Sequence, residues 1–197
     1  MRDIQIFNQI YSLTCEDHLS SSPVIDAVFG IGDISLETAL EIDHASMNMY
    51  HFSGYTALHF AIRRDDLSAV RLLLSYKAEP LSRTRDLWVD SCLHLAARLG
   101  SLALVEALLT TGSDVNARNG YDRTPLHVAV SAGNKEVVDR LLAAGASVQA
   151  LDVNGCNAFH HAAWEYYGSA EDVQDFMLSE NQSQLHLFTA KKHLFNT

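Results

Sequence analysis

Cysteine is scarce in this sequence, and the few cysteines are too far apart to form a metal or redox site. The chain of 197 residues contains three, Cys15, Cys92 and Cys156, and no C-x-x-C pair occurs. Disulfide scaffolds use a dense and even set of cysteines, whereas zinc and thiol redox sites use closely spaced ones. The sequence therefore favours a reducing compartment, and we expect a cytoplasmic or nuclear protein without a metal site.

Long apolar runs and clusters of basic residues are also missing. Residues 1–14 mix polar with apolar side chains, which is not typical of a signal peptide, and no later segment reaches the roughly 20 apolar residues of a membrane span. Lys and Arg number 14 against 24 Asp and Glu, a net charge of -10 that opposes binding to a phosphate backbone. Neither G-x-x-x-x-G-K-[ST] nor G-x-G-x-x-G occurs. We therefore expect no cofactor, no nucleic acid and no membrane among the partners.

What the sequence does contain is an internal repeat. Four six-residue segments resemble one another, and each has a histidine at its fourth position. These histidines are separated by 35, 33 and 33 residues, a period typical of stacked helical repeats. The segments are TALHFA (56–61), SCLHLA (91–96), TPLHVA (124–129) and NAFHHA (157–162).

The third segment carries a family resemblance. TPLHVA matches the T-P-L-H-x-A signature of the ankyrin repeat at every fixed position, so the chain resembles the ankyrin repeat family. The segments that follow it, and those in the preceding repeat, continue the family pattern through Gly112 and Gly145, which we expect to close second helices in a left-handed conformation. The resemblance implies an all-α fold, an ankyrin-repeat solenoid of stacked helix-turn-helix units joined by β-hairpin fingers.

The domain boundaries follow from this period. A fainter copy begins at Ser22 and is expected to be a degenerate N-terminal cap, and the last copy also departs from the pattern, as end units do when one face meets water. We expect an N-terminal extension at 1–21, an ankyrin repeat domain at 22–187 and a C-terminal tail at 188–197. The approximate repeats within the domain are 22–52, 53–87, 88–120, 121–153 and 154–187.

One finger departs from the others. Lys77 and Ala78 replace the closing glycine, Pro80 follows, and the connection to the next motif is two residues longer. Val89 stands where Gly54 and Gly155 stand in other repeats. We expect the finger at 81–90 to be irregular and more exposed.

The motif histidines invite a metal or acid-base interpretation, but the resemblance implies a structural one. His59, His94, His127 and His160 are expected to hydrogen-bond the backbone of the adjacent hairpin, because buried polar groups are normally paired. The adjacent His160 and His161 cannot place both rings on one helix face, and no H-x-x-x-H accompanies them. We therefore predict no metal ligands and no catalytic residues.

The resemblance also implies that partners bind to the fingers and to the exposed positions of the first helices. Phe60, Leu95, Val128 and His161 follow the motif histidines and are expected to form one row along the concave face. Alternatively, Leu95 and Val128 pack against the neighbouring helix. Trp, Tyr and Arg dominate the remaining positions, as in interface hot spots. The other predicted partner-binding residues are Tyr55, Arg63, Arg64, Trp88, Asp90, Arg98, Tyr121, Arg123 and Trp164.

Two functions fit this surface. The first is a non-catalytic interaction module, an adaptor, scaffold or inhibitor, that binds a partner segment with an apolar ridge and acidic residues to meet the arginines, or that serves as one module of a larger assembly. The second is a small-molecule-binding protein or enzyme in which the aromatic groove is a substrate pocket. In that alternative, His161, Arg98, Asp90 or Tyr121 would act as acid-base or orienting groups. A deep pocket with convergent polar groups would favour the second function, and a shallow open groove the first.

Overall fold

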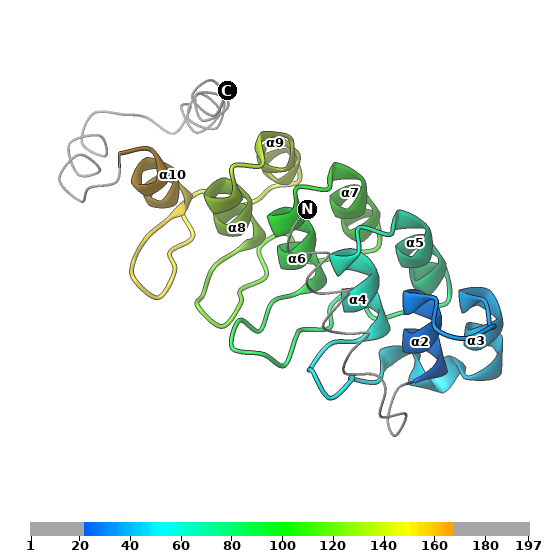
Figure 1. The fold of residues 1–197 in the computed structure, drawn as a ribbon. Helices are drawn as coiled ribbons and strands as arrows, with labels where there is room; N and C mark the ends of the chain where they lie inside the picture. The colour runs from blue at the N-terminus through cyan, green and yellow to red at the C-terminus, as the bar shows by residue number, and fades with distance from the viewer. Residues whose placement is uncertain (1–21, 168–197) are drawn as a thin grey trace.

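The computed structural model describes the backbone of residues 22–167 and the side chains of residues 22–162. The predicted N-terminal extension and C-terminal tail lie outside these residues, as does the side chain of Trp164. Within the described part the chain forms helices joined by loops (Figure 1). In chain order these are α2 (Pro23–Phe29), α3 (Leu36–Ile42), the 3-10 helix η1 (His44–Asn48), α4 (Ala57–Arg63), α5 (Leu67–Ser75), α6 (Cys92–Leu99), α7 (Leu102–Thr110), α8 (Pro125–Ala132), α9 (Lys135–Ala143) and α10 (Ala158–Tyr167).

The helices lie in two layers, and successive repeats are stacked side by side (Figure 1). The first helices α2, α4, α6, α8 and α10 form one layer, in which each contacts the next. The second helices α3, α5, α7 and α9 form the other, and the fingers project from one edge of the stack. This arrangement confirms the predicted all-α solenoid of helix-turn-helix units.

The first helices α4, α6 and α8 each begin at a hydroxyl residue that the motif histidine helps to cap. The Nδ1 atoms of His59, His94 and His127 accept a hydrogen bond from the backbone amide of the residue three positions earlier, at 3.1, 3.3 and 3.1 Å. Those residues are Thr56, Ser91 and Thr124, the N-caps of α4, α6 and α8. Capping of this kind contributes about 1 kcal/mol per helix, so the histidine helps to fix where these three helices start.

The second helices α5, α7 and α9 are each followed by a left-handed residue, as the sequence predicted for Gly112 and Gly145. Gly112 and Gly145 have φ angles of 88° and 89° just after α7 and α9. Lys77 takes the same place after α5, with φ 72°. A side chain in this region of backbone conformation costs free energy that glycine avoids, so this repeat closes at a residue less suited to the turn.

The core is one continuous cluster of buried side chains that runs through all the described repeats. Leu58, Leu93 and Leu126, the residues before the motif histidines, are at most 1% exposed. Full burial of such a side chain contributes about 2 kcal/mol. The alanines at Ala61, Ala96 and Ala129 are completely buried and small, which lets adjacent first helices approach closely.

The predicted row of exposed apolar residues on the first helices is wrong. Phe60, Leu95 and Val128 are 1%, 5% and 7% exposed. The Phe60 ring packs edge-on against Phe29 of α2, with ring centroids 5.1 Å apart. Phe60 and Leu95 belong to the apolar core, and Val128 is buried as well, which agrees with the alternative that these side chains pack between helices.

The finger at 81–90 is irregular, as predicted. It belongs to the longest connection between the described helices, residues 76–91, and its regular β-structure is a single antiparallel bridge between Arg83 and Ser91. Val89 adopts φ 51°, a left-handed conformation that β-branched residues rarely take. Leu87 is exposed at its tip, whereas Asp90 at its end is buried, contrary to the expected exposure.

Candidate functional site

Two of the motif histidines, His94 and His127, connect their repeat to the finger of the next. His94 Nε2 lies 2.8 Å from the carbonyl oxygen of Arg123, and His127 Nε2 lies 3.1 Å from that of Cys156. Since Nδ1 accepts from the N-cap amide, Nε2 carries the proton and donates to the carbonyl. Burial lowers the pKa of His127 to about 4 and also lowers that of His94. These rings are neutral structural links.

His59 does not make the equivalent bond. Its Nε2 atom is buried without a hydrogen-bond partner in the described part of the chain. The carbonyl that would match those of Arg123 and Cys156 belongs to Asp90, and it accepts instead from the Thr84 amide at 2.8 Å. The longer finger thus folds back on itself. The corresponding contact of His160 would fall beyond the described residues.

A second set of hydrogen bonds between neighbouring fingers was not predicted from the sequence. Asp86, Asn119 and Asp152 lie eight residues before successive motif histidines, at the turn of each finger. Each accepts hydrogen bonds from its own turn: Asp86 from the Trp88 amide at 3.0 Å, Asn119 from that of Tyr121 at 2.9 Å and Asp152 from that of Asn154 at 2.9 Å. Such Asx turns hold the finger tips in shape. The repeated Asp or Asn at this spacing is the signal that could have revealed them.

The second polar atom of each of these side chains binds the preceding finger. Tyr55 donates to Asp86 at 2.6 Å, Asn119 donates to Asp90 at 2.8 Å, and Arg123 donates to Asp152 at 3.3 Å. Three residues predicted to bind partners, Tyr55, Asp90 and Arg123, therefore cross-link neighbouring fingers. We name the set Tyr55, Asp86, Asp90, Asn119, Arg123 and Asp152 the finger ladder.

Arginines of the first helices support the finger ladder from the side. Arg63 donates to the Tyr55 hydroxyl at 2.8 Å, and Arg98 donates to the Asp90 carboxylate at 2.7 Å. Burial, followed by the hydrogen bond to Asp86, raises the pKa of Tyr55 to about 12, so this phenol stays protonated and donates. Arg64 lies elsewhere, with its guanidinium carbon 5.3 Å from the centre of the Phe29 ring.

His161 occupies the position of Phe60, Leu95 and Val128 in the last repeat, and it is held by polar partners. Its Nε2 lies 2.9 Å from an Asp152 oxygen, and its Nδ1 lies 3.2 Å from the Ser131 hydroxyl. Burial alone would raise the pKa of Asp152, but the hydrogen bonds from His161 and from the Cys156 and Asn154 amides outweigh it and lower this pKa to about 2.

The order Ser131, His161, Asp152 resembles a hydrolytic triad, but the repeat gives it a structural explanation. Asp152 holds its own turn and binds the preceding finger, as Asp86 and Asn119 do in fingers that have no such histidine. Its carboxylate is therefore explained without a reaction. The two described cysteines are no better suited to nucleophilic attack, because burial raises the pKa of Cys92 to about 12 and also raises that of Cys156.

The part of the predicted surface that remains exposed is an aromatic pair. Trp88 and Tyr121, at the tips of adjacent fingers, are 41% and 38% exposed, and their ring centroids lie 4.9 Å apart. The guanidinium carbon of Arg98 sits 5.2 Å from the Trp88 ring centre, within cation-π distance. The backbone amide of Gly120 donates to the Trp88 carbonyl at 2.6 Å, which fixes the two fingers together. We call Trp88, Tyr121 and Arg98 the aromatic cluster.

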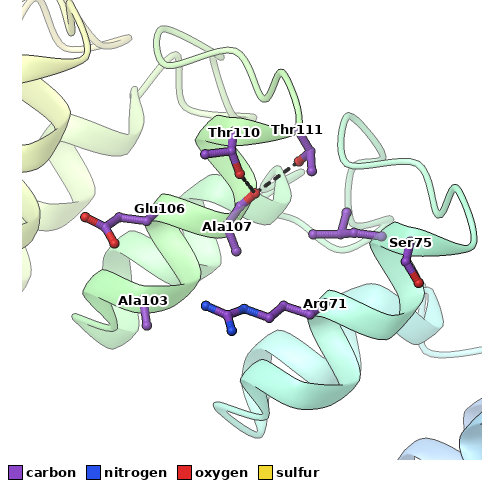
Figure 2. Close-up of a pocket in the computed structure, with 8 residues that line it drawn as sticks. Arg71, Ser75, Ala103, Glu106, Ala107, Thr110 and Thr111 are labelled. Carbon is purple, nitrogen blue, oxygen red and sulfur yellow. Dashed lines mark hydrogen bonds between the residues drawn. The ribbon is translucent and has the colours of Figure 1, made fainter.

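A groove of about 450 Å³ lies in the other helix layer, between α5 and α7 (Figure 2). Arg71 extends from α5 across it toward Ala103 of α7, and the hydroxyls of Thr110 and Thr111 donate to the Ala107 carbonyl at one end. None of the predicted binding residues lines this groove. No three His, Cys, Asp or Glu side chains of the described residues gather as a metal site would require, and no helix among residues 22–167 is long and apolar enough to span a bilayer.

Comparison with known proteins agrees with the repeat. The sequence model of a family described as ankyrin repeats (3 copies) matches residues 25–119 and 93–187. NF-kappa-B inhibitor epsilon of Homo sapiens is 46% identical over 134 residues, covering 64% of this chain and 27% of the relative. NF-kappa-B inhibitor alpha of Mus musculus is 31% identical over 122 residues, covering 58% and 37%. A transient receptor potential cation channel subfamily A member 1 homolog of Caenorhabditis elegans is 37% identical over 95 residues, covering 48% of this chain and 8% of the relative. This chain thus spans at most 37% of the length of these relatives.

Proposed function

This chain belongs to the ankyrin repeat family, and from that premise we propose that it is a non-catalytic protein-protein interaction module whose partner binds across the fingers and first helices. Such a module acts as an adaptor, a scaffold or an inhibitor. Two of its relatives are, by their names, inhibitors of NF-kappa-B, which supports the third of these roles. We therefore propose NF-kappa-B as a candidate target for this chain, which spans only part of those relatives.

The observation that carries the proposal is the aromatic cluster. A Trp and a Tyr in contact at the surface, with an arginine over the indole, have the composition of an interface hot spot. The fingers that carry the two rings are joined by the Gly120 amide and by the Asn119–Asp90 bond, which hold the two backbones together. A rigid aromatic surface loses little conformational entropy on binding.

The arginines have a smaller part than the sequence suggested. Arg98 and Arg123 are paired with Asp90 and Asp152, and Arg63 bonds Tyr55. These three guanidinium groups therefore bind residues of the finger ladder. The side chain of Arg98 is nevertheless 43% exposed, and a guanidinium has five donors, so it retains donors for a carboxylate or carbonyl of the partner.

The enzyme and small-molecule alternative has less support. Its proposed groups Asp90 and Arg98 are bonded to each other, and His161 is held between Ser131 and Asp152. The groove in Figure 2 lies between second helices, away from these groups. No described feature brings a free acid-base pair to the aromatic cluster.

The test is site-specific photo-crosslinking in native cell extract and, as a defined probe, with purified NF-kappa-B. A photoreactive residue replaces Tyr121, and a matched control replaces Ile42, which is exposed on α3 at the other end of the stack. The proposal expects a discrete adduct at 121 that is absent at 42 and is lost on Trp88→Ala, without a change in melting temperature. Equal labelling at both positions, or no adduct at 121, would overturn it.

A further inference from the structure

The fingers carry a second surface, formed by residues nine and seven positions before each motif histidine. In the four fingers these pairs are Tyr50 with Phe52, Arg85 with Leu87, Arg118 with Gly120, and Leu151 with Val153. The apolar members are strongly exposed: Phe52 71%, Leu87 86%, Leu151 50% and Val153 56%. We name Phe52, Arg85, Leu87, Arg118, Leu151 and Val153 the hairpin strip.

Contacts between fingers hold the hairpin strip together. The guanidinium of Arg85 stacks on the Tyr50 ring, with its carbon 3.7 Å from the ring centre, and the Arg85 amide donates to the Gly54 carbonyl at 2.9 Å. Arg118 donates to the Leu151 carbonyl at 2.5 Å, and Arg83 donates to the Arg118 carbonyl. The strip is therefore a continuous surface that runs over four repeats.

Charge distinguishes the centre of the strip from its ends. Arg85 and Arg118 are exposed, and neither lies within 4 Å of a carboxylate in the described part of the chain. Arg98 and Arg123, only a few residues away, both have buried aspartate partners. On a chain with a net charge of -10, two uncompensated guanidinium groups flanked by apolar side chains form a local site for an anionic group.

We propose that the hairpin strip docks an extended protein segment that has carboxylates at its centre and apolar side chains at both ends. Charge complementarity selects this partner, because the carboxylates would meet Arg85 and Arg118 while the apolar ends cover Phe52 and Leu87 on one side and Leu151 and Val153 on the other. Stacked helices lie about 8–10 Å apart, and an extended chain rises about 3.3 Å per residue, so each repeat accommodates about three partner residues. A segment of about ten residues covers the strip.

This inference does not depend on the aromatic cluster. The residues of the strip are joined through Tyr50, Arg83 and the Leu151 carbonyl, whereas Trp88 contacts Tyr121 and Arg98. The two surfaces meet through the backbone, where the Val153 amide donates to the Tyr121 carbonyl at 3.1 Å, so a side-chain substitution in one surface removes none of these side-chain contacts of the other.

The experiment uses three synthetic ten-residue peptides with identical leucine and phenylalanine ends and a central pair of Glu, Gln or Lys. Binding to the full chain is measured by isothermal titration calorimetry at low and at physiological salt. The Glu peptide should bind at least about tenfold more tightly than the Gln peptide, as charge-assisted hydrogen bonds require, and the difference should shrink as salt rises. The Lys peptide should not bind.

Protein variants locate the site. Arg85→Gln with Arg118→Gln should reduce the affinity for the Glu peptide to that for the Gln peptide. Arg71→Gln, on the outer helix α5, and Trp88→Ala should leave it unchanged. Equal binding of the three peptides, no binding of the Glu peptide at millimolar concentration, or insensitivity to the double arginine variant would each overturn the proposal. Loss of Glu-peptide binding on Trp88→Ala would assign the peptide to the aromatic cluster instead.

Discussion

The side-chain amide of Asn119 donates a hydrogen bond of 2.8 Å to the carboxylate of Asp90 in the preceding finger, and both side chains are buried. The equivalent positions of the neighbouring pairs of fingers hold Tyr55 bonded to Asp86 and Arg123 bonded to Asp152. In those two pairs the donor, Tyr55 or Arg123, lies in the earlier finger. In the Asn119–Asp90 pair the donor, Asn119, lies in the later finger. An asparagine therefore stands where aspartates stand elsewhere, because its partner is itself a carboxylate.

We expect Asn119→Asp to lower the free energy of unfolding by about 3 kcal/mol at pH 7. Two carboxylates would then share a buried site at hydrogen-bond distance, where like charges repel and neither is fully solvated. Urea denaturation followed by circular dichroism measures the change. Adding Asp90→Asn should recover part of the loss, because donor and acceptor then exchange sides while Arg98 loses its ion pair. An unchanged urea midpoint for the single variant would show that the finger ladder contributes little to stability.

Stability should fall as the pH drops from about 6.5 to 4, because of the buried histidines. Burial lowers the pKa of His59 and His127 from 6.5 to about 4, so in this window the unfolded chain binds protons that the folded chain does not. Each such histidine contributes up to about 1.4 kcal/mol per pH unit to the slope, or roughly 3 kcal/mol over the window. Asp152 affects stability in a lower pH range. Its pKa is lowered from 3.8 to about 2, so the stability that it contributes is lost only as the pH falls from 3.8 toward 2.

The free energy of unfolding measured at pH 7, 5.5 and 4.5 tests this linkage. His127→Gln should lower stability at pH 7 and flatten the slope between these values, since one titrating group is removed. If His127→Gln leaves the slope unchanged, the acid sensitivity has another origin.

Val89→Gly should stabilise the chain by about 1 kcal/mol. Val89 has φ 51° in the irregular finger, and a β-branched residue there is strained by about 1–3 kcal/mol, part of which is offset by the flexibility that glycine adds to the unfolded chain. Asp122 has φ 55° at the equivalent turn of the next finger, and Asp tolerates this conformation better. Asp122→Gly should therefore change stability by less than about 0.5 kcal/mol. Thermal melts of both variants compare the two positions, and a larger gain at position 122 would contradict the strain argument.

The fold was readable from the sequence because it repeats. Spacing alone located the motif histidines. Thr124 and Pro125 marked the start of a helix, and in the structure α8 begins at Pro125 with Thr124 as its N-cap. The glycines after α7 and α9 and the unusual finger at 81–90 were also correctly placed, since left-handed turns restrict which residues fit. These features depend on local geometry that one repeat shares with the next.

The surface was harder to predict, because its residues are decided by contacts between repeats. Phe60 follows its motif histidine and sits at the edge of the helix face, where the distance to α2 determines whether it is buried or exposed. The bond from Tyr55 to Asp86 joins residues 31 positions apart, and no single motif contains both partners. The Asp or Asn eight residues before His94, His127 and His160 was visible in the sequence, but only the structure pairs it with the preceding finger.

Two glycines with the same backbone conformation separate the effect of backbone strain from that of crowding. Gly100 and Gly112 have φ angles of 79° and 88°. A Cβ added at Gly112 would meet no atom within 4 Å, whereas one added at Gly100 would come within 2.7 Å of Asn134 Oδ1. The Asn134 side chain does not swing away freely, because it donates to the carbonyls of Ala97 and Arg98 at 2.8 and 3.1 Å.

Gly112→Ala should therefore cost about 1 kcal/mol, the penalty of a left-handed alanine, and Gly100→Ala about 3 kcal/mol. Urea denaturation of the two variants gives the difference directly. Asn134→Ala in the Gly100→Ala background should relieve the clash, although it also removes the two bonds that join α9 to the end of α6. If the two glycine variants lose equal stability, the contact between α6 and Asn134 is loose, and the repeats are held together by their apolar interfaces alone.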